Sequence, residues 1–145
     1  MANGFSGGFK ELERWRRQIE QAGSENTLRK LNAVLAEETL TLIADGFRKS
    51  KTPTGRRWKP KKRPDGRKIL VGKTARLRNG WHRSQIGPES FTVSPSVDYA
   101  KYHQTGTRRG LVPRQMIPDG NRLPSRWDRA FQETAEDFLE AQFRG

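Results

Sequence analysis

Apolar residues recur at helical spacing twice in the N-terminal half of the chain, and each pattern predicts a helix. The first follows a glycine-rich start and consists of Leu12, Trp15, Ile19 and Ala22. Gly23 ends it, and Ser24 is suited to cap the next helix. The second pattern predicts the clearest helix of the chain. Its stripe is Leu28, Leu31, Leu35, Thr39 and Leu42, widened by Val34, Ile43 and Phe47.

A third helical pattern predicts a C-terminal helix with two different faces. Pro124 and Ser125 suit its start, because proline fits the first turn and serine caps free backbone N–H groups. Its apolar side is marked by Trp127, Phe131, Thr134, Phe138 and Ala141. Its exposed side is acidic and carries Glu133, Glu136, Asp137 and Glu140.

Alternating apolar positions between these helices predict a β-hairpin. Phe91, Val93 and Val97 alternate as expected of a strand with one buried face, and residues 81–86 alternate loosely. The Gly-Pro-Glu sequence at 87–89 predicts the turn between them.

Shorter patterns add to this sheet and set the fold class. Residues 69–71 and 116–117 predict two more short strands, and Leu77 a brief helical turn. We expect an α+β fold in which a small antiparallel sheet packs against the long helix and the C-terminal helix. Residues 1–8 are expected to be a flexible N-terminus and residues 9–145 a single domain.

The hairpin leads into a segment that presents two phenols and an imidazole. Asp98 can cap a short helix through its carboxylate. Tyr99, Tyr102 and His103 follow at spacings of three and four, which places them on one side of that helix. Gly106 suits the end of the helix, where a positive φ favours glycine.

The segment 48–68 is strongly basic and predicts a loop or extended arm. Asp65 is its only acid, and its prolines and glycines exclude a continuous helix, although a two-strand excursion remains possible. We interpret Trp58 as an apolar anchor rather than as a base-stacking side chain. The residues expected to face DNA or a partner are Arg56, Arg57, Lys59, Lys61, Lys62, Arg63, Arg67 and Lys68.

The amino-acid composition indicates that the protein has a negatively charged binding partner. The formal net charge is +13 and the pI about 10.9, which indicates a polyanion, most plausibly nucleic acid, or else an acidic protein. A merely solvated basic surface is the plain alternative. In a second interpretation, the basic residues contact the acidic side of a neighbouring subunit's C-terminal helix. Only 32% of residues are hydrophobic, so we expect a subunit that buries additional area against neighbours. The apolar residues it could spare for this are Trp15, Trp127, Phe138 and Phe143.

The chain offers little for catalysis. It has no cysteine and only two histidines, and no motif places a carboxylate to orient His103 as a general base. We therefore expect His103 to be structural, bonded to backbone or buried against the sheet, and Asp98 to cap a helix rather than bind a metal. No Gly-rich phosphate loop opens a helix. We predict no enzyme activity, no cofactor and no metal.

No segment reaches the roughly twenty apolar residues that span a bilayer, and the N-terminus lacks a signal-peptide core. We expect synthesis in a cytoplasm and no membrane partner.

Four segments, in order, resemble motifs of the tailed-phage virion morphogenesis proteins, the tail-completion or neck proteins of Mu-like and related phages. Residues 53–60 resemble "P-x-G-x-x-W-x-P", residues 70–79 "I-L-x-x-(T-G)-x-L-R", residues 99–106 "YA-x-x-H-x-x-G", and residues 114–118 the closing "P-x-R-P-F-L". The matching residues are Trp58, Leu70, Leu77, Tyr99, Ala100, His103, Gly106, Arg114 and Pro118.

This resemblance implies a structural virion protein, made in the bacterial host cytoplasm, that joins head to tail. Such proteins form rings in the neck through which the genome passes. It implies a homo-oligomer, for which we expect a hexameric ring, that contacts other neck, connector and tail proteins. The alternative from the residues alone is a sequence-independent nucleic-acid-binding protein.

Overall fold

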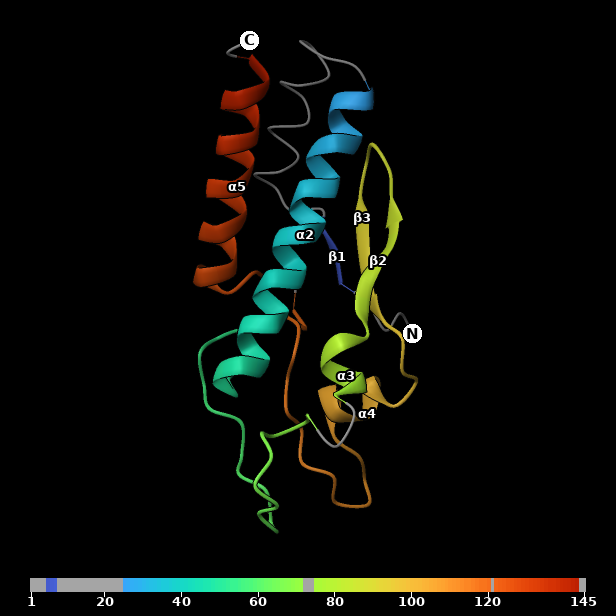
Figure 1. Ribbon diagram of the computed structural model, residues 1–145, viewed down its shortest axis with the longest axis vertical. Coiled ribbons are helices and arrows are strands. Elements are labelled where there is room, and N and C mark those ends of the chain that lie inside the picture. The colour runs from blue at the N-terminus through green and yellow to red at the C-terminus, as the bar shows by residue number, and fades with distance from the viewer. Residues whose placement is uncertain (1–4, 8–24, 72–74, 121, 144–145) are drawn as a thin grey trace.

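The computed structural model describes residues 5–7, 25–71, 75–120 and 122–143 of the 145-residue chain. In chain order the elements are β1 (Phe5–Gly7), α2 (Glu25–Lys49), α3 (Arg76–Asn79), β2 (Trp81–Ile86), β3 (Phe91–Pro95), α4 (Ala100–Thr105) and α5 (Ser125–Phe143). Figure 1 shows α2 between α5 on one flank and the β2–β3 hairpin on the other. The predicted α+β fold is confirmed. The helix predicted around Trp15 lies outside the described residues.

Helix α2 supplies the predicted buried stripe. Leu31, Leu35 and Phe47 are each 1% exposed, and together with the other stripe residues they pack against β3 and α5. Thr39 is buried as well, and its hydroxyl donates to the carbonyl oxygen of Leu35 at 2.9 Å, so burial leaves this group paired. The predicted contribution of Val34 is wrong. It is 36% exposed, because the buried face is centred between Leu35 and Ala36 and Val34 lies beyond Leu35, at its edge.

The β2–β3 hairpin confirms the strands predicted around 81–86 and 91–95. Ile86 lies opposite Phe91 in an antiparallel ladder, with a register shift between Arg83 and Gln85. Phe91 and Val93 are buried beneath α2. At the turn, the side-chain amide of Asn32 donates to the carbonyl of Gly87 at 2.6 Å, which ties the hairpin to α2.

Strand β1 adds a third strand in the order β1-β3-β2. Phe5 lies opposite Val93 and Gly7 opposite Phe91, again antiparallel. Phe5–Gly7 therefore form a strand within the segment that the sequence predicts to be flexible, because the inner strand β3 offers them a second row of backbone groups.

Helix α5 packs along α2, and its apolar face differs in detail from the predicted one. Trp127 and Phe131 are buried edge to face at 6.1 Å, and Ala135 is fully buried. Thr134 is only half-buried and Ala141 is exposed, whereas Phe138 packs against the core as the stripe predicts and so is not wholly spare either. The 3% exposure of Trp127 also means that this side chain already belongs to the core, contrary to the prediction that it is spare.

Two predicted strands do not form. Residues 69–71 make a turn in which Leu70 has a φ of 64°, a value incompatible with a strand. Met116 and Ile117 are buried but lie in a segment without strand pairing that bends at Ile117. Their backbone groups bond instead to the side chain of Gln104, which takes the place of a neighbouring strand.

The two short helices lie beyond one end of the hairpin (Figure 1). Leu77 lies on α3, which confirms the predicted helical turn, and its side chain is buried. Helix α4 begins one residue later than expected, so Tyr99 rather than Asp98 holds the cap position, and no side chain caps it. The prediction that Asp98 is the N-cap is therefore wrong. Gly106 does end α4, with a φ of 76° and its N–H donating to the carbonyl of Tyr102 at 2.8 Å.

Candidate functional site

The predicted start of the basic segment is wrong by two residues, because Arg48 and Lys49 lie in the last turn of α2. The basic loop, residues 50–68, leaves the end of α2 and reaches one end of the molecule (Figure 1). Trp58 anchors it, as the sequence predicts. Its ring is 4% exposed and packs edge to face on Phe47, with ring centroids 5.4 Å apart. Its Nε1 donates to the carbonyl of Gln115 at 2.8 Å. With both its apolar surface and its polar atom engaged inside the fold, Trp58 does not offer a face for base stacking.

The start of the loop folds back on itself. Lys51 and Arg57 form a single antiparallel bridge, and the N–H of Thr52 donates to the carbonyl of Arg56 at 2.7 Å. The two-strand excursion left open by the sequence is therefore reduced to one bridge around a tight turn.

Arg114 fixes the loop beyond Trp58. Its guanidinium donates to the carbonyl oxygens of Lys59, at 2.9 Å, and Pro60, at 3.3 Å. Its backbone N–H donates to the carbonyl of His103 at 2.7 Å. Arg114 therefore connects the basic loop to α4 and uses its charge to satisfy backbone carbonyls.

The tip of the loop is ordered by its only acid. Lys61 donates to the carboxylate of Asp65 at 2.6 Å and to the carbonyl of Arg67 at 2.9 Å. The side-chain hydrogen bond from Lys61, followed by the backbone N–H of Arg67, lowers the pKa of the Asp65 carboxyl below its ordinary 3.8. The Lys61 charge is thus partly used within the loop.

The other predicted basic residues remain open to solvent. The exposed members are Arg56, Arg57, Lys59, Lys62, Arg63, Arg67 and Lys68. Lys68 also donates to the carbonyl of Arg48 at 2.8 Å, which holds the returning arm near the end of α2. A cluster of exposed cations is consistent with contact to a polyanion or an acidic surface.

Helix α4 carries the two phenols and the imidazole. Tyr99 packs edge to face on His103 at 5.9 Å, whereas Tyr102 is 48% exposed and lies below the ammonium group of Lys101, 5.2 Å from its ring centroid. Desolvation, and secondarily the Arg114 charge, lowers the pKa of His103 below its ordinary 6.5. His103 Nδ1 finds no hydrogen-bond partner among the described residues. The predicted backbone bond is therefore absent at this atom, and the ring is held by packing.

Gln104, which the sequence analysis passed over, is the central polar side chain here. Its Oε1 accepts from the N–H groups of Met116, at 2.8 Å, and Ile117, at 3.2 Å, and its Nε2 donates to the carbonyl of Ile117 at 2.7 Å. Its signal in the sequence is no stronger than that of any polar residue in a short helix. Its role follows only from the tertiary structure.

Three of the four family-like segments therefore meet at one place. Trp58 and Arg114 join the loop to the closing segment, and Gln104 joins that segment to α4. Ala100 is 2% exposed, Pro118 is half-buried, and Leu70 is half-buried in its turn. These residues build the base from which the basic loop projects.

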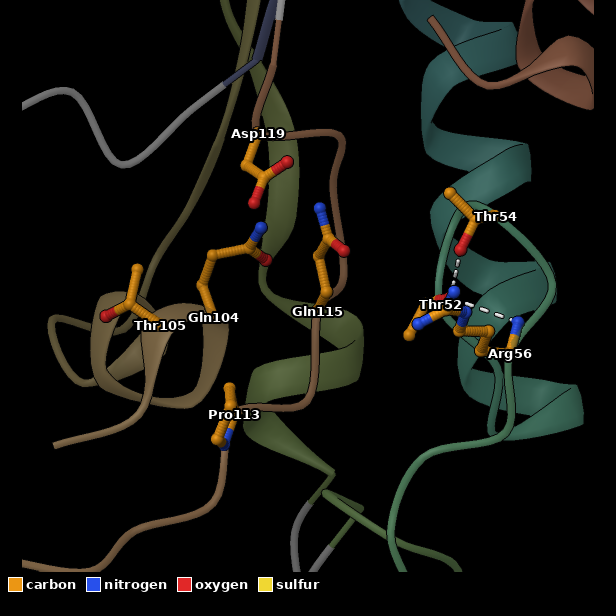
Figure 2. Close-up of a pocket in the computed structure, with 8 residues that line it drawn as sticks. All are labelled: Thr52, Thr54, Arg56, Gln104, Thr105, Pro113, Gln115 and Asp119. Carbon is orange, nitrogen blue, oxygen red and sulfur yellow. Dashed lines mark hydrogen bonds between the residues drawn. The ribbon is translucent and has the colours of Figure 1, made fainter.

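A cleft of about 640 Å³ opens between the loop and the closing segment. Figure 2 shows one wall built by the start of the loop, where Thr52 accepts from the N–H of Arg56 at 3.1 Å and its hydroxyl lies 2.9 Å from that of Thr54. The residues lining it are Thr52, Thr54, Arg56, Gln104, Thr105, Pro113, Gln115 and Asp119. Most of its lining residues carry polar groups, and they include one cation, Arg56, and one acid, Asp119.

A separate acidic surface lies on α5. Glu133, Glu136 and Asp137 are exposed, opposite the face that holds Phe131. Burial of Glu38 on α2, together with the charge of Glu133, raises the pKa of the Glu38 carboxyl above its ordinary 4.5. The negative potential of this surface therefore reaches the seam between the two helices.

Among the described residues, no three His, Cys, Asp or Glu side chains converge in a way that could hold a metal ion. Within that same part of the chain, no helix combines the length and apolar character that crossing a membrane requires.

The fold and these surfaces define a small α+β domain with a projecting basic loop and an acidic helix face. The chain belongs to the phage virion morphogenesis family, whose sequence model matches residues 8–135. The resemblance of the four segments is confirmed at the level of this family, and with it a role in virion assembly. Comparisons with curated proteins and with solved structures gave no match.

Proposed function

We propose that this protein is a non-catalytic subunit of the phage neck. Copies of it form a closed ring of about six subunits at the head–tail junction, as closed cyclic assemblies of one chain do. The ring completes the tail, attaches it to the head and lets the genome pass. Its partners are other neck, connector and tail proteins, and its role resembles that of the Mu-like tail-completion proteins.

Family membership supports virion assembly, and the separation of charge supports the ring. The single observation that carries the proposal is that exposed acids gather on α5, while exposed cations lie on other surfaces of the same chain, many of them on the basic loop. Head-to-tail interfaces need two different, complementary surfaces on one chain, and opposite charges provide them.

The test uses phage that lack only this chain. We expect full heads and separate tails in electron micrographs, with infectivity restored when the protein is supplied in trans. Light scattering of the purified protein, alone and with virion partners, should give the mass of a closed oligomer. Infectious tailed particles without the chain, or a monomer under both conditions, would overturn the proposal.

The second candidate is sequence-independent nucleic-acid binding. It is favoured by the seven exposed basic residues of the loop, which contains Asp65 as its only acid. Binding that is mainly electrostatic weakens steeply as salt rises, because bound counterions are released. A monomer that binds duplex DNA tightly at physiological salt would favour this candidate over the ring.

A further inference from the structure

A groove on the flank opposite α5 carries positive charge, which is opposite to the charge of the acidic surface on α5. It lies between the first half of α2 and strand β2 and has a volume of about 440 Å³. Its lining residues are Arg29, Lys30, Ala33, Arg83, Ser84, Gln85 and Ile86. Arg83 pairs with Glu37 at 3.1 Å, whereas Arg29 and Lys30 are exposed. The groove is therefore cationic, with an apolar floor at Ala33 and Ile86.

The acidic surface and this groove lie on opposite flanks and toward the same end of the molecule. Helix α5 forms one flank and the hairpin the other, and the C-terminal half of α5 runs beside the N-terminal half of α2 (Figure 1). Glu136 and Asp137 belong to the former half, and Arg29 and Lys30 to the latter. Arg129 also lies on the outer face of α5, but in the half of the helix that is farther from the groove. The acidic part of this face is therefore at the same height along the molecule as the groove.

This placement matters for a ring. Rotation about a closed cyclic axis involves no translation, so two surfaces that meet must lie at the same height along it. With the axis along the length of the molecule, the acidic part of α5 is level with the groove. The basic loop lies at the other end (Figure 1). The loop is therefore badly placed to receive a neighbouring α5.

Strand addition is a poorer use of this flank. Strand β2 is last in the order β1-β3-β2, but its register shift between Arg83 and Gln85 breaks the regular edge that another strand would need. A helix needs only a groove and complementary charge.

We propose that the groove between α2 and β2 binds the acidic outer face of α5 from a second copy of this chain, head to tail. This inference rests on the proposed ring and names its interface. Glu133, Glu136 and Asp137 of one subunit would face Arg29 and Lys30 of the next. The basic loop is left free for the bore or for other virion proteins.

Charge reversal tests the pairing. The variant R29E/K30E has an acidic groove and an acidic α5, and the variant E136K/D137K has a basic groove and a basic α5. Each alone should be monomeric in light scattering, with at least about a hundredfold rise in the concentration needed for assembly, because like charges then oppose each other. Mixed together, the two variants should assemble, since each groove then meets an α5 of opposite charge.

The matched control is K62E/R63E, which makes the same change of charge on the basic loop and should assemble like the unmodified chain. All substituted positions are exposed, and circular dichroism should show unchanged helix content. If R29E/K30E assembles normally, or if K62E/R63E alone blocks assembly, the groove is not the interface, although the neck ring stands. A monomeric unmodified chain, alone and with virion partners, would overturn both. The pairing is also overturned if R29E/K30E or E136K/D137K fails to assemble alone and the mixture of the two fails as well. This holds even if an acidic virion protein binds the groove.

Discussion

At the scale of single residues, Gly106 shows why one position between α4 and the loop that follows accepts only glycine. Its φ of 76° and ψ of 178° form a combination open essentially to glycine alone. A Cβ here would lie 2.7 Å from the carbonyl oxygen of Leu111 and 3.0 Å from Cδ of Pro113. The backbone is therefore constrained twice, by conformation and by contact.

We expect Gly106→Ala to destabilise the protein more than Gly55→Ala. Gly55 also has a positive φ, of 93°, but a Cβ there would meet nothing within 4 Å. Gly55→Ala should cost about 1–2 kcal/mol from backbone strain, and Gly106→Ala about 1–3 kcal/mol more from the clash. Chemical denaturation of both variants measures the difference. Equal losses would mean that the loop after α4 relaxes freely.

His103 gives the chain a pH-dependent stability. The pKa of His103 is lowered in the folded protein, whereas in the unfolded chain it has its ordinary value of 6.5. When pH falls below 6.5, the unfolded chain therefore binds a proton at His103 more readily than the folded chain does. The free energy of unfolding should therefore fall as pH drops below 6.5, until pH passes the folded pKa. His103→Gln removes this titration, so the variant should lose less stability between pH 7 and pH 5.

The control for His103→Gln is the range from pH 7.5 to 9, where the imidazole is neutral in both states and both proteins should show the same pH dependence. Urea denaturation across both ranges gives the two curves. Parallel curves below pH 6.5 would show that the ring of His103 is as well solvated in the folded protein as in the unfolded one.

The structural role of Gln104 cannot be predicted from the sequence. Its amide satisfies the N–H groups of Met116 and Ile117 and one carbonyl, across a sequence distance of 12 or 13 residues. The apolar pair Met116 and Ile117 predicts a short strand, but the structure buries both side chains without strand pairing. The sequence does not indicate what pairs with the backbone, because a side-chain amide can replace a strand.

At the scale of elements, the basic loop is a projecting segment with a rigid base. Trp58 buries its ring against Phe47 and its Nε1 bonds to Gln115, while Arg114 holds the carbonyls that follow. A long loop costs entropy to order, and these few contacts offset that cost at its root. The exposed tip has fewer such contacts.

Trp58→Ala should both destabilise the fold and release the loop. Truncating a buried tryptophan costs about 3–5 kcal/mol. Trp58→Phe keeps most of the ring packing but leaves the Gln115 carbonyl without its donor, at about 1–2 kcal/mol. Denaturation measures both losses, and limited trypsin digestion should cut the 56–68 segment faster in Trp58→Ala under native conditions. Unchanged digestion would show that Trp58 does not hold the loop.

The elements differ in how well the sequence predicts them. Helix α2, the β2–β3 hairpin and α5 follow from periodicity, because each buries one face over many residues. The strand predicted at residues 69–71 fails, since three apolar residues fit a turn as well as a strand and Leu70 takes a positive φ. On α5, Ala135 rather than Thr134 is buried, because it follows Trp127 and Phe131 at intervals of four residues and so lies on the same face of the helix.

At the scale of the whole molecule, charge is distributed unevenly. The basic loop lies at one end, and the acidic part of α5 lies toward the other (Figure 1). The sequence indicates the excess of +13 and the segments that carry it. The sequence does not indicate at which end or on which flank of the molecule these segments lie, because this depends on how α5 folds back along α2. The candidate cleft beside Gln104 is likewise assembled from segments about 50 residues apart.

This distribution predicts which charges govern contact with DNA. We expect the protein to bind duplex DNA weakly, with K62E/R63E reducing the salt dependence, as the slope of log K against log salt, by about two. The variant R29E/K30E makes the same change in net charge at the groove and should leave that slope unchanged. Fluorescence anisotropy over a salt series, at concentrations where both variants are monomeric, gives the slopes. Equal reductions in both variants would mean that DNA senses the overall charge of the domain and that the basic loop is no specific contact surface.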